Sequence, residues 1–386
     1  MRQLFGLLFF SLLFLVDQAT AQKAVAPSEQ QIDAIFSAVT SPDASGLAAM
    51  IRKDGHTVYA KGFGVRDLRT KARIDSHTNF RLASFTKQFT AMAIMLLVHD
   101  GKLRYDQTLT EVIPGFADYG KNVTIRNLLN HTGGLPDYED LMDAAEKAKG
   151  RAIWSPDHQI QDDEVLALLE KESKAKFAAA TSWSYSNSGY VVLGIVVAKI
   201  SGEPYRDFLH ARIFAPLHMD HTVVYQKGIN EVSNRAVGHS NDGGTFQETD
   251  QSSTSATLGD GGIYSNLDDL SKWDDALRNH TLLSAKEMSP ALVPAKLANG
   301  SPTLWPTAPN DDNLHPGKPV AYGFGWFLDP YRGDERIWHT GSTMGFRTVI
   351  ERFTRDNLTI VVLANRTDLD PESLALKTAE LYLHKN

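Results

Sequence analysis

Short apolar runs typical of β-strands lie near both ends of the chain, and longer runs with helical spacing lie between them. Residues 46–52 and 56–63 flank Asp54-Gly55, and an Asp-Gly pair between two apolar runs predicts a β-hairpin. A turn is predicted at residues 354–357, between two runs close to the C-terminus. The strand candidates in this part of the chain are residues 322–328, 336–338, 346–353 and 358–364.

The helical patterns are strongest in the middle of the chain. Residues 86–99 are apolar almost throughout and are followed by Asp100-Gly101, which is typical of a helix C-terminus. Residues 295–319 are rich in Pro, Asn and Asp and predict a long loop. The other expected helices cover residues 32–39, 191–200, 267–277 and 371–384.

The order of these elements predicts an α/β fold of the α+β type. Two strands from the start and three from the end would form one antiparallel five-stranded sheet flanked by helices. The sheet region would comprise residues from about 30 to 80 and from 320 to 386, with a mostly helical region inserted at about 81–319. We therefore expect residues 22–386 to form a single unit.

The first residues resemble a secretory signal peptide. Arg2 supplies a positive charge, residues 4–16 form an apolar run, and Ala19-Thr20-Ala21 fits an A-x-A cleavage site. The run has about 13 residues, whereas a membrane-spanning helix needs about 20. We expect cleavage after Ala21 and a periplasmic or secreted protein without a transmembrane segment; the alternative is an uncleaved N-terminal anchor.

Composition restricts the function classes. The 386 residues include 39 Lys and Arg against 46 Asp and Glu, a net charge of −7, which argues against nucleic acid as the main partner. The absence of cysteine excludes disulfides, thiolate nucleophiles and Cys-ligated zinc. His218 and His221 are the only close histidine pair and have no third ligand nearby, so neither a metal nor a cofactor is predicted. The expected partner is a small-molecule or peptide substrate, and the oligomeric state is not readable.

A Ser-x-x-Lys motif marks the start of the apolar helix. Ser84 and Lys87 lie three residues apart, so on a helix the amine can reach the hydroxyl, and the helix N-terminus favours a developing oxyanion. Ser173 and Lys176 have the same spacing but follow a charged, solvated stretch. Ser84 is therefore the better nucleophile candidate, although a simple N-cap role is the alternative.

Two further motifs each occur twice. Tyr185-x-Asn187 precedes an apolar helix and can supply a phenol for proton transfer and a carboxamide that holds a substrate amide or the lysine. The second Tyr-x-Asn ends in Asn266, which has an acidic residue three positions later and fits an N-cap.

The His-Thr-Gly motif is also present in two copies. His339-Thr340-Gly341 follows the strand candidate 336–338, and Gly341 would let a substrate approach the main chain. The other copy starts at His131 in a tight Gly-Gly-x-Pro turn and is interpreted as structural.

In this order and context, Ser84-x-x-Lys87, Tyr185-x-Asn187 and His339-Thr340-Gly341 resemble the serine β-lactamase and penicillin-binding protein family, in its class C-like branch. The resemblance covers residues from about 30 to 384 and implies the β-lactamase/transpeptidase-like fold. That branch contains class C β-lactamases, D-alanyl-D-alanine carboxypeptidases, D-aminopeptidases and related esterases. Further blocks that resemble the branch are residues 128–136, 215–219, 261–265 and 322–326.

The resemblance implies a role for each motif. Ser84 would be acylated, with Lys87 as its base partner and Tyr185 as the residue that shuttles the proton. Binding of the substrate would fall to Asn187, the His339-Thr340-Gly341 strand, and the backbone N–H groups of Ser84 and Ser342 as an oxyanion hole.

One departure from the family pattern bears on the substrate. Class C β-lactamases have Lys-Thr-Gly where this chain has His339, and a neutral imidazole attracts a carboxylate less than an ammonium does. We therefore expect an exported acyl-enzyme hydrolase of amide or ester bonds, most like a D-amino-acid peptidase or carboxypeptidase. The alternatives are a β-lactamase, a short-chain esterase and a penicillin-binding sensor with little turnover.

Arg347 could bind a carboxylate or simply be a solvated strand residue. No G-x-S-x-G motif supports an α/β-hydrolase.

Overall fold

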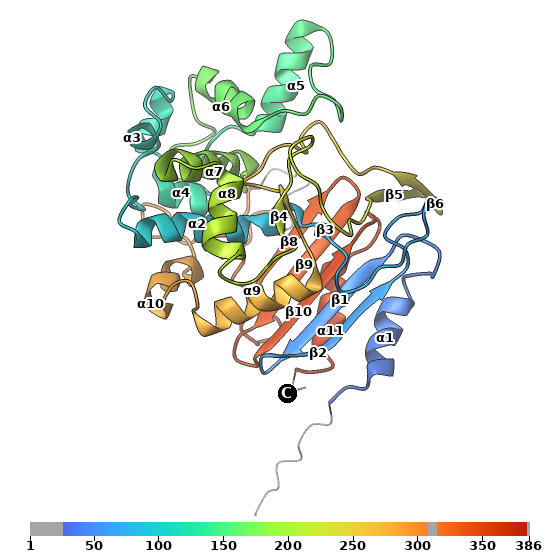
Figure 1. Cartoon of the computed structure of the whole chain (residues 1–386). Coiled ribbons are helices and arrows are strands. Elements are labelled where there is room, and N and C mark those ends of the chain that lie inside the picture. Colours follow the sequence, from blue (N-terminus) through green and yellow to red (C-terminus); the bar gives the residue numbers. More distant parts are fainter. Residues whose placement is uncertain (1–25, 308–314, 384–386) are drawn as a thin grey trace, which may run out of the picture.

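A five-stranded antiparallel sheet with helices on both faces organises the computed structural model, which describes residues 26–307 and 315–383 (Figure 1). The strand order is β2-β1-β10-β9-β8, so two strands from the start of the chain join three from its end. The predicted fold class is confirmed. The strands are β1 (Leu47–Lys53), β2 (His56–Phe63), β8 (Arg336–Thr343), β9 (Phe346–Phe353) and β10 (Leu358–Ala364).

Local sequence explains the turns of this sheet. Asp54 and Gly55 both have positive φ, 51° and 82°, which gives the hairpin turn a twist that matches the strands β1 and β2. Residues 354–357 form the predicted turn between β9 and β10, and Asn357 adopts φ 46° there. Strand β1 then pairs with β10 along its whole length, from Leu47 opposite Ala364 to Lys53 opposite Leu358.

Both faces of the sheet are buried, which explains why β10 is apolar throughout. Val361 and Leu363 pack into the core of the helical region, whereas Ile360 and Val362 pack against the opposite layer. That layer consists of α1 (Glu29–Ser37) and α11 (Pro371–Ala379). A strand covered on both sides has no polar face, so its sequence shows an unbroken apolar run.

The inserted region is built around α2 (Lys87–His99) and α7 (Asn187–Ser201), which pack against each other. Helix α2 is buried from Lys87 to Leu97, as expected for a helix that is apolar all round. The 3₁₀ turn η1 (Ala83–Thr86) leads into it. The remaining helices are α3 (Leu109–Val112), α4 (Ile125–Leu129), α5 (Tyr138–Lys149), α6 (Asp162–Lys171), α8 (Tyr205–Leu209), α9 (Leu267–Asn279) and α10 (Ala285–Met288), with shorter helical turns at η2 (Asp118–Asn122), η3 (His210–Phe214) and η4 (Ser289–Leu292).

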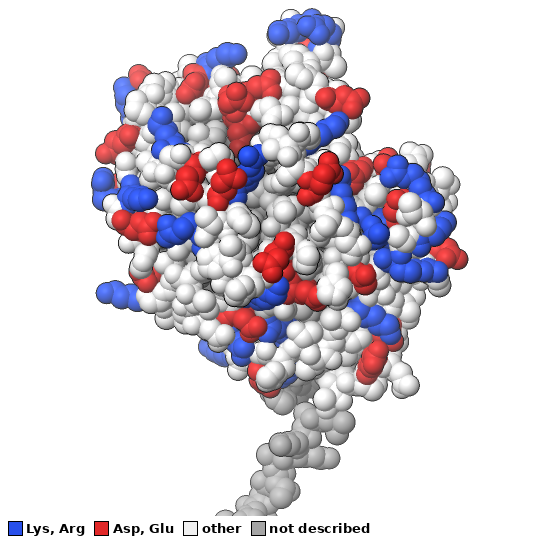
Figure 2. Space-filling model, viewed as in Figure 1, with Lys and Arg blue, Asp and Glu red and all other residues white. Residues whose placement is uncertain are grey.

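Two small sheets in the inserted region were not predicted. One has the order β3-β7-β4 and the other pairs β5 with β6. They are short, and their strands are β3 (Phe80–Arg81), β4 (Val223–Val224), β5 (His239–Asp242), β6 (Thr245–Glu248) and β7 (Ile263–Ser265). On the face seen in Figure 2, acidic and basic side chains are interspersed over the surface of the protein.

Some expected element boundaries are wrong. Residues 322–328 form a tight turn instead of a strand, because Gly325 has φ 76° and Tyr322 pairs back on Phe327. Strand β8 is longer than predicted and includes the His339-Thr340-Gly341 motif. Helix α11 ends at Ala379, and the predicted end of this helix at His384 lies outside the described residues, as does the predicted signal peptide.

Within residues 26–307 and 315–383, no helix is long and apolar enough to cross a membrane.

Candidate active site

The nucleophile candidate lies on the turn that opens α2. Ser84 is in η1 and Lys87 is the first residue of α2, and the Lys87 Nζ lies 3.0 Å from the Ser84 Oγ. Ala83, directly before the serine, has φ 50°, a conformation that costs a non-glycine residue energy. The predicted proximity of serine and lysine is confirmed, on a strained and buried stretch of backbone.

Lys87 is fully buried and connects three segments of the chain. Its Nζ donates to the Asn187 Oδ1 at 2.9 Å and to the main-chain oxygen of Asp260 at 3.1 Å. The rings of Tyr185 and Tyr190 lie 4.9 and 5.5 Å from the same nitrogen. The amine is therefore held by the hydrogen bonds that it donates to α7 and to the segment before β7.

The Tyr-x-Asn motif is placed by the start of α7. Ser186 caps this helix, with its Oγ accepting from the Gly189 N–H at 3.0 Å, and Asn187 is the first helical residue. Tyr185 comes just before the cap and is partly buried against an aromatic cluster. The cap thus directs Asn187 onto Lys87 and leaves the Tyr185 ring beside the lysine. The cluster consists of Trp183, Trp305, Val320, Tyr322, Phe327 and Trp338.

His339 lies inside the protein rather than on an open surface. It is 1% exposed, and its Nδ1 lies 2.6 Å from the Thr340 carbonyl oxygen. A carbonyl can only accept, so Nδ1 carries the hydrogen and Nε2 accepts from the Tyr322 hydroxyl at 3.0 Å. Burial, followed by the nearby charge of Lys87, lowers the pKa of His339 to about 3. The ring is neutral, and both of its nitrogens are engaged by the protein.

Gly341 has a different purpose from the one expected. A Cβ at this position would lie 2.1 Å from the Leu82 carbonyl oxygen and 2.4 Å from the Thr348 Oγ1. Thr348 donates its hydroxyl hydrogen to the same Leu82 oxygen at 2.8 Å. The space beside Gly341 is filled by the chain that leads to Ser84 and is not left for a substrate. This glycine allows the Leu82–Ala83 segment to lie close against β8.

The outer edge of β8 carries the other motif residues. Trp338 directs its N–H and C=O away from β9 to pair with Phe327, at 3.0 and 2.9 Å. Main-chain groups two residues apart in a strand point the same way, so those of Thr340 and Ser342 also face this outer edge. Thr340 is half-buried and Ser342 is exposed. This edge can offer N–H groups to a ligand.

Arg347 lies directly opposite Ser342 on β9. Its Nη1 donates to the carbonyl oxygens of Thr343 and Phe346, both at 2.8 Å, and burial lowers the pKa of the guanidinium from its ordinary value. Among the described residues, no carboxylate lies within salt-bridge distance of it.

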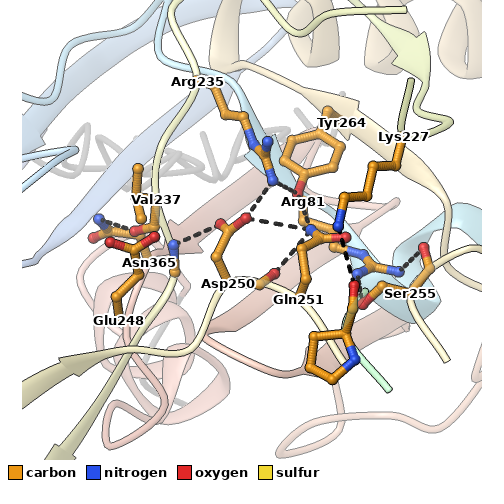
Figure 3. Close-up of polar contacts among 12 residues, drawn as sticks. Arg81, Lys227, Arg235, Val237, Glu248, Asp250, Gln251, Ser255, Tyr264 and Asn365 are labelled. Atoms are coloured by element: carbon orange, nitrogen blue, oxygen red, sulfur yellow. Dashed lines mark hydrogen bonds and ion pairs between the residues drawn. The ribbon is translucent and has the colours of Figure 1, made fainter. Parts of the chain in front are cut away.

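A buried arginine that the motifs did not reveal fixes the segment containing Asp260. Arg81 is 3% exposed and donates to the Ser255 Oγ at 2.6 Å and the Ser255 carbonyl at 3.0 Å (Figure 3). Its Nε donates to the Gly261 carbonyl at 3.3 Å. The sequence signal was a cation in an otherwise apolar stretch, three residues before Ser84.

The second copies of the three motifs lie in different places in the structure. Ser173 and Lys176 are both exposed on the surface, and Asn266 caps α9 by accepting from the Asp269 N–H at 2.9 Å, as predicted. His131, by contrast, lies beside the candidate site, with its ring centroid 4.5 Å from that of Tyr185.

Comparisons with known proteins identify the family of the chain. The chain matches the Beta-lactamase family model over residues 30–384. It is 31% identical over 341 residues to penicillin-binding protein 4* of Bacillus subtilis (strain 168), covering 84% of this chain and 69% of that protein.

Two solved structures show the same fold. A penicillin-binding protein homologue from Pyrococcus abyssi, described as octameric, superposes with a TM-score of 0.72 at 24% identity, over 92% of this chain and 76% of the other. The D-amino acid amidase of Ochrobactrum anthropi SV3 superposes with a TM-score of 0.71 at 24% identity, over 91% and 96%. The chain belongs to the beta-lactamase family and is a serine hydrolase that acts through an acyl-enzyme.

Proposed function

We propose that Ser84 is the acylated nucleophile and Lys87 its general base. The observation that carries this proposal is the position of the Lys87 Nζ, 3.0 Å from the Ser84 Oγ and 2.9 Å from the Asn187 Oδ1. A neutral amine keeps two N–H groups, which suffice for Asn187 and the Asp260 carbonyl. Its lone pair then faces the Ser84 hydroxyl and can take the proton.

The remaining groups fit the later steps of acyl transfer. As Ser84 attacks the carbonyl carbon, the backbone N–H groups of Ser84 and Ser342 stabilise the oxyanion. Lys87 and Tyr185 carry the proton to the leaving group, whose departure gives the acyl-enzyme. Water then attacks the ester, the same residues accept its proton and return it to the Ser84 Oγ, and the acid is released.

For the substrate we propose an amide bond next to a D-amino acid, in a peptide or an amino-acid amide. The neutral, buried His339 supports this choice over efficient β-lactam hydrolysis, because β8 carries no permanent cation at that position. The names of the relatives, a penicillin-binding protein and a D-amino acid amidase, point to the same chemistry. Arg347, next to Ser342, would favour substrates with a free carboxylate.

We further propose that the chain is exported, with cleavage after Ala21, and that residues 22–386 act as one unit with a sheet region and an inserted helical region. The apolar run and the A-x-A site support export. N-terminal sequencing of the protein recovered from the periplasm or medium tests it; a chain that still begins at Met1 would contradict it.

The proposed function is tested with a matched set of substrates. A peptide ending in D-Ala-D-Ala, its C-terminal amide, a D-amino-acid amide, a short-chain ester and a penicillin are each incubated with the wild type, Ser84→Ala and Ser173→Ala. We expect turnover of the D-amino-acid amides or peptides by wild type and Ser173→Ala only. Preference for the free-carboxylate peptide, lost in Arg347→Gln, would identify a carboxypeptidase.

Intact mass spectrometry separates the alternatives. A lasting penicillin adduct on wild type without turnover of any substrate indicates a sensor, and a consumed penicillin indicates a β-lactamase. Turnover of the ester alone indicates an esterase. Full activity in Ser84→Ala would overturn the assignment of the nucleophile.

A further inference from the structure

His131 is held in an unfavourable state. Its φ is 63°, it is 1% exposed, and its Nε2 has no hydrogen-bond partner among the described residues. Left-handed backbone and a buried unpaired polar atom each reduce stability. An apolar side chain would avoid the second cost, so simple packing does not explain a histidine here.

His131 forms hydrogen bonds with the residues directly before and directly after Tyr185. The Ser184 N–H donates to the His131 carbonyl oxygen at 3.1 Å, and the Ser186 N–H donates to its Nδ1 at 3.2 Å. The imidazole ring also lies against the Tyr185 ring, with centroids 4.5 Å apart. His131 therefore fixes the residues on either side of Tyr185 through its carbonyl oxygen and its Nδ1. Its ring also packs against the phenol ring of Tyr185.

The rest of the turn holds α7 in the same way. The Tyr190 hydroxyl donates to the Leu129 carbonyl at 2.7 Å, and the Ser188 hydroxyl donates to the Pro136 carbonyl at 2.7 Å. The first turn of α7, which carries Asn187, is thus attached to the stretch around His131.

We propose that His131 is a positioning residue for Tyr185: its Nδ1 and carbonyl oxygen fix the Ser184–Ser186 backbone so that the phenol stays beside Lys87. This rests on the proposed role of Tyr185 in proton transfer. It assigns a purpose to the second His-Thr-Gly copy, which the sequence suggested to be only structural.

Imidazole protonation does not enter this role. Nδ1 accepts a hydrogen bond, so the ring hydrogen lies on Nε2. Burial is the main cause that holds the pKa of His131 well below its ordinary value, and the nearby Lys87 and His339 would both oppose a positive charge on the ring. The other titratable groups that face the ring are the phenols of Tyr185, Tyr190 and Tyr322. His131 thus remains an acceptor over the working pH range.

Two substitutions separate the hydrogen bond from the backbone conformation. Asn and Gly both tolerate positive φ, but only the Asn Oδ1 can replace Nδ1 as an acceptor. For His131→Gly we expect kcat to fall about 30-fold with KM within about 3-fold, since small displacements of a catalytic group cost up to about 100-fold. For His131→Asn we expect kcat within about 3-fold of wild type. Thermal unfolding of both variants checks that they fold.

Tyr185→Phe provides the second arm. If His131 acts through Tyr185, adding His131→Gly to Tyr185→Phe lowers kcat by less than about 3-fold. Equal kcat in His131→Gly and His131→Asn, or a full 30-fold further loss in the double variant, overturns the positioning role. Full activity of Tyr185→Phe instead contradicts the proposed function of Tyr185, so the two failures are distinguishable.

Discussion

The two His-Thr-Gly stretches, residues 131–133 and 339–341, place their histidines in similar surroundings. Both histidines are 1% exposed, and both rings contact Tyr322, with centroids 4.5 and 5.8 Å apart. For both, burial is the main cause that lowers the pKa, and Lys87 adds to it. Although the two histidines lie more than 200 positions apart in the sequence, both contact Tyr322 of the same aromatic cluster.

Their backbones differ, and the backbone decides what each stretch contributes. His131 lies in a turn at positive φ and bonds to the chain on either side of Tyr185. His339 lies in the extended strand β8 and bonds to its own neighbour, Thr340. The glycines differ as well, since Gly341 touches main chain and Gly133 meets side chains. A tripeptide therefore does not define a site; the element that carries it does.

The largest effect on activity is expected when the lysines of the two Ser-x-x-Lys copies are compared. Lys87→Met removes the proposed base, and kcat/KM should fall about 10,000-fold, which corresponds to about 5.5 kcal/mol of transition-state stabilisation. Lys176→Met changes an exposed residue and should leave kcat/KM within about 2-fold. Steady-state kinetics on the preferred substrate measures both.

Thermal unfolding is the control for this pair. Methionine has a side chain of similar length, so Lys87→Met should remain folded, with a loss of about 1 to 3 kcal/mol because the Asn187 Oδ1 and the Asp260 carbonyl lose their donor. A stable Lys87→Met protein with near-normal kcat/KM would contradict the assignment of the base.

The next effect compares the glycines of the two His-Thr-Gly stretches. In Gly341→Ala the new Cβ would lie 2.1 Å from the Leu82 carbonyl oxygen, so β8 and the segment leading to Ser84 must move apart. We expect a loss of about 3 to 4 kcal/mol in unfolding free energy, together with most of the activity. In Gly133→Ala the nearest atoms are side-chain carbons of Leu128 and Val123 at 3.2 Å, which can adjust, and we expect a change of less than about 1 kcal/mol.

Urea unfolding and kinetics of the two alanine variants measure this difference. Similar stabilities for Gly341→Ala and Gly133→Ala would show that contact between β8 and η1 is not what requires glycine in the strand.

The sequence was sufficient for features that depend on local pattern. The bounds of β9 and β10 were predicted correctly, because a strand buried on both faces is apolar throughout and the turn at 354–357 has polar residues. The hairpin at Asp54-Gly55 followed from turn chemistry. The contact between Ser84 and Lys87 followed from helical spacing, although the serine lies in a 3₁₀ turn.

Features that depend on contacts between distant segments were not predictable. Gly341 faces Leu82, more than 250 residues away in the chain, and no local signal contains that contact. The same holds for Arg81 and Ser255, and for His131 and Ser186. The strand prediction for residues 322–328 was wrong for a related reason. Apolar side chains of this stretch pack in a cluster built from several segments of the chain, and Gly325 turns the backbone.

The third effect concerns the lowered pKa that the two buried histidines, His131 and His339, share. The unfolded chain binds a proton to histidine below a pKa of about 6.5, whereas His339 in the folded protein has a pKa of about 3. The folded state thus binds fewer protons in this window, so stability is complete above about pH 6.5 and decreases as the pH falls towards 3. Each such histidine adds a slope of at most about 1.4 kcal/mol per pH unit.

The measurement is the unfolding free energy from urea titrations between about pH 5 and 6.5, where the histidines of the unfolded chain take up protons. His339→Gln and His131→Asn should each reduce the slope of unfolding free energy against pH by up to about 1.4 kcal/mol per pH unit, which corresponds to one proton. A slope unchanged in both variants would mean that neither ring is kept neutral by folding.

The smallest effect compares the two Tyr-x-Asn copies. Asn187 faces Lys87, whereas Asn266 accepts from the Asp269 N–H at 2.9 Å and caps α9. Asn266→Ala should therefore lose about 1 kcal/mol of unfolding free energy for the N-cap, in addition to the bond that Asn266 donates to the Asn79 Oδ1 at 3.2 Å, and Asn266→Ser should restore the N-cap part. Neither should change kcat/KM by more than about 2-fold, because Asn266 acts on a helix terminus and not on the lysine. If Asn266→Ala lost activity while remaining as stable as the wild type, the two copies could not be separated by their structural elements, and the distinction between cap and site would fail for this motif.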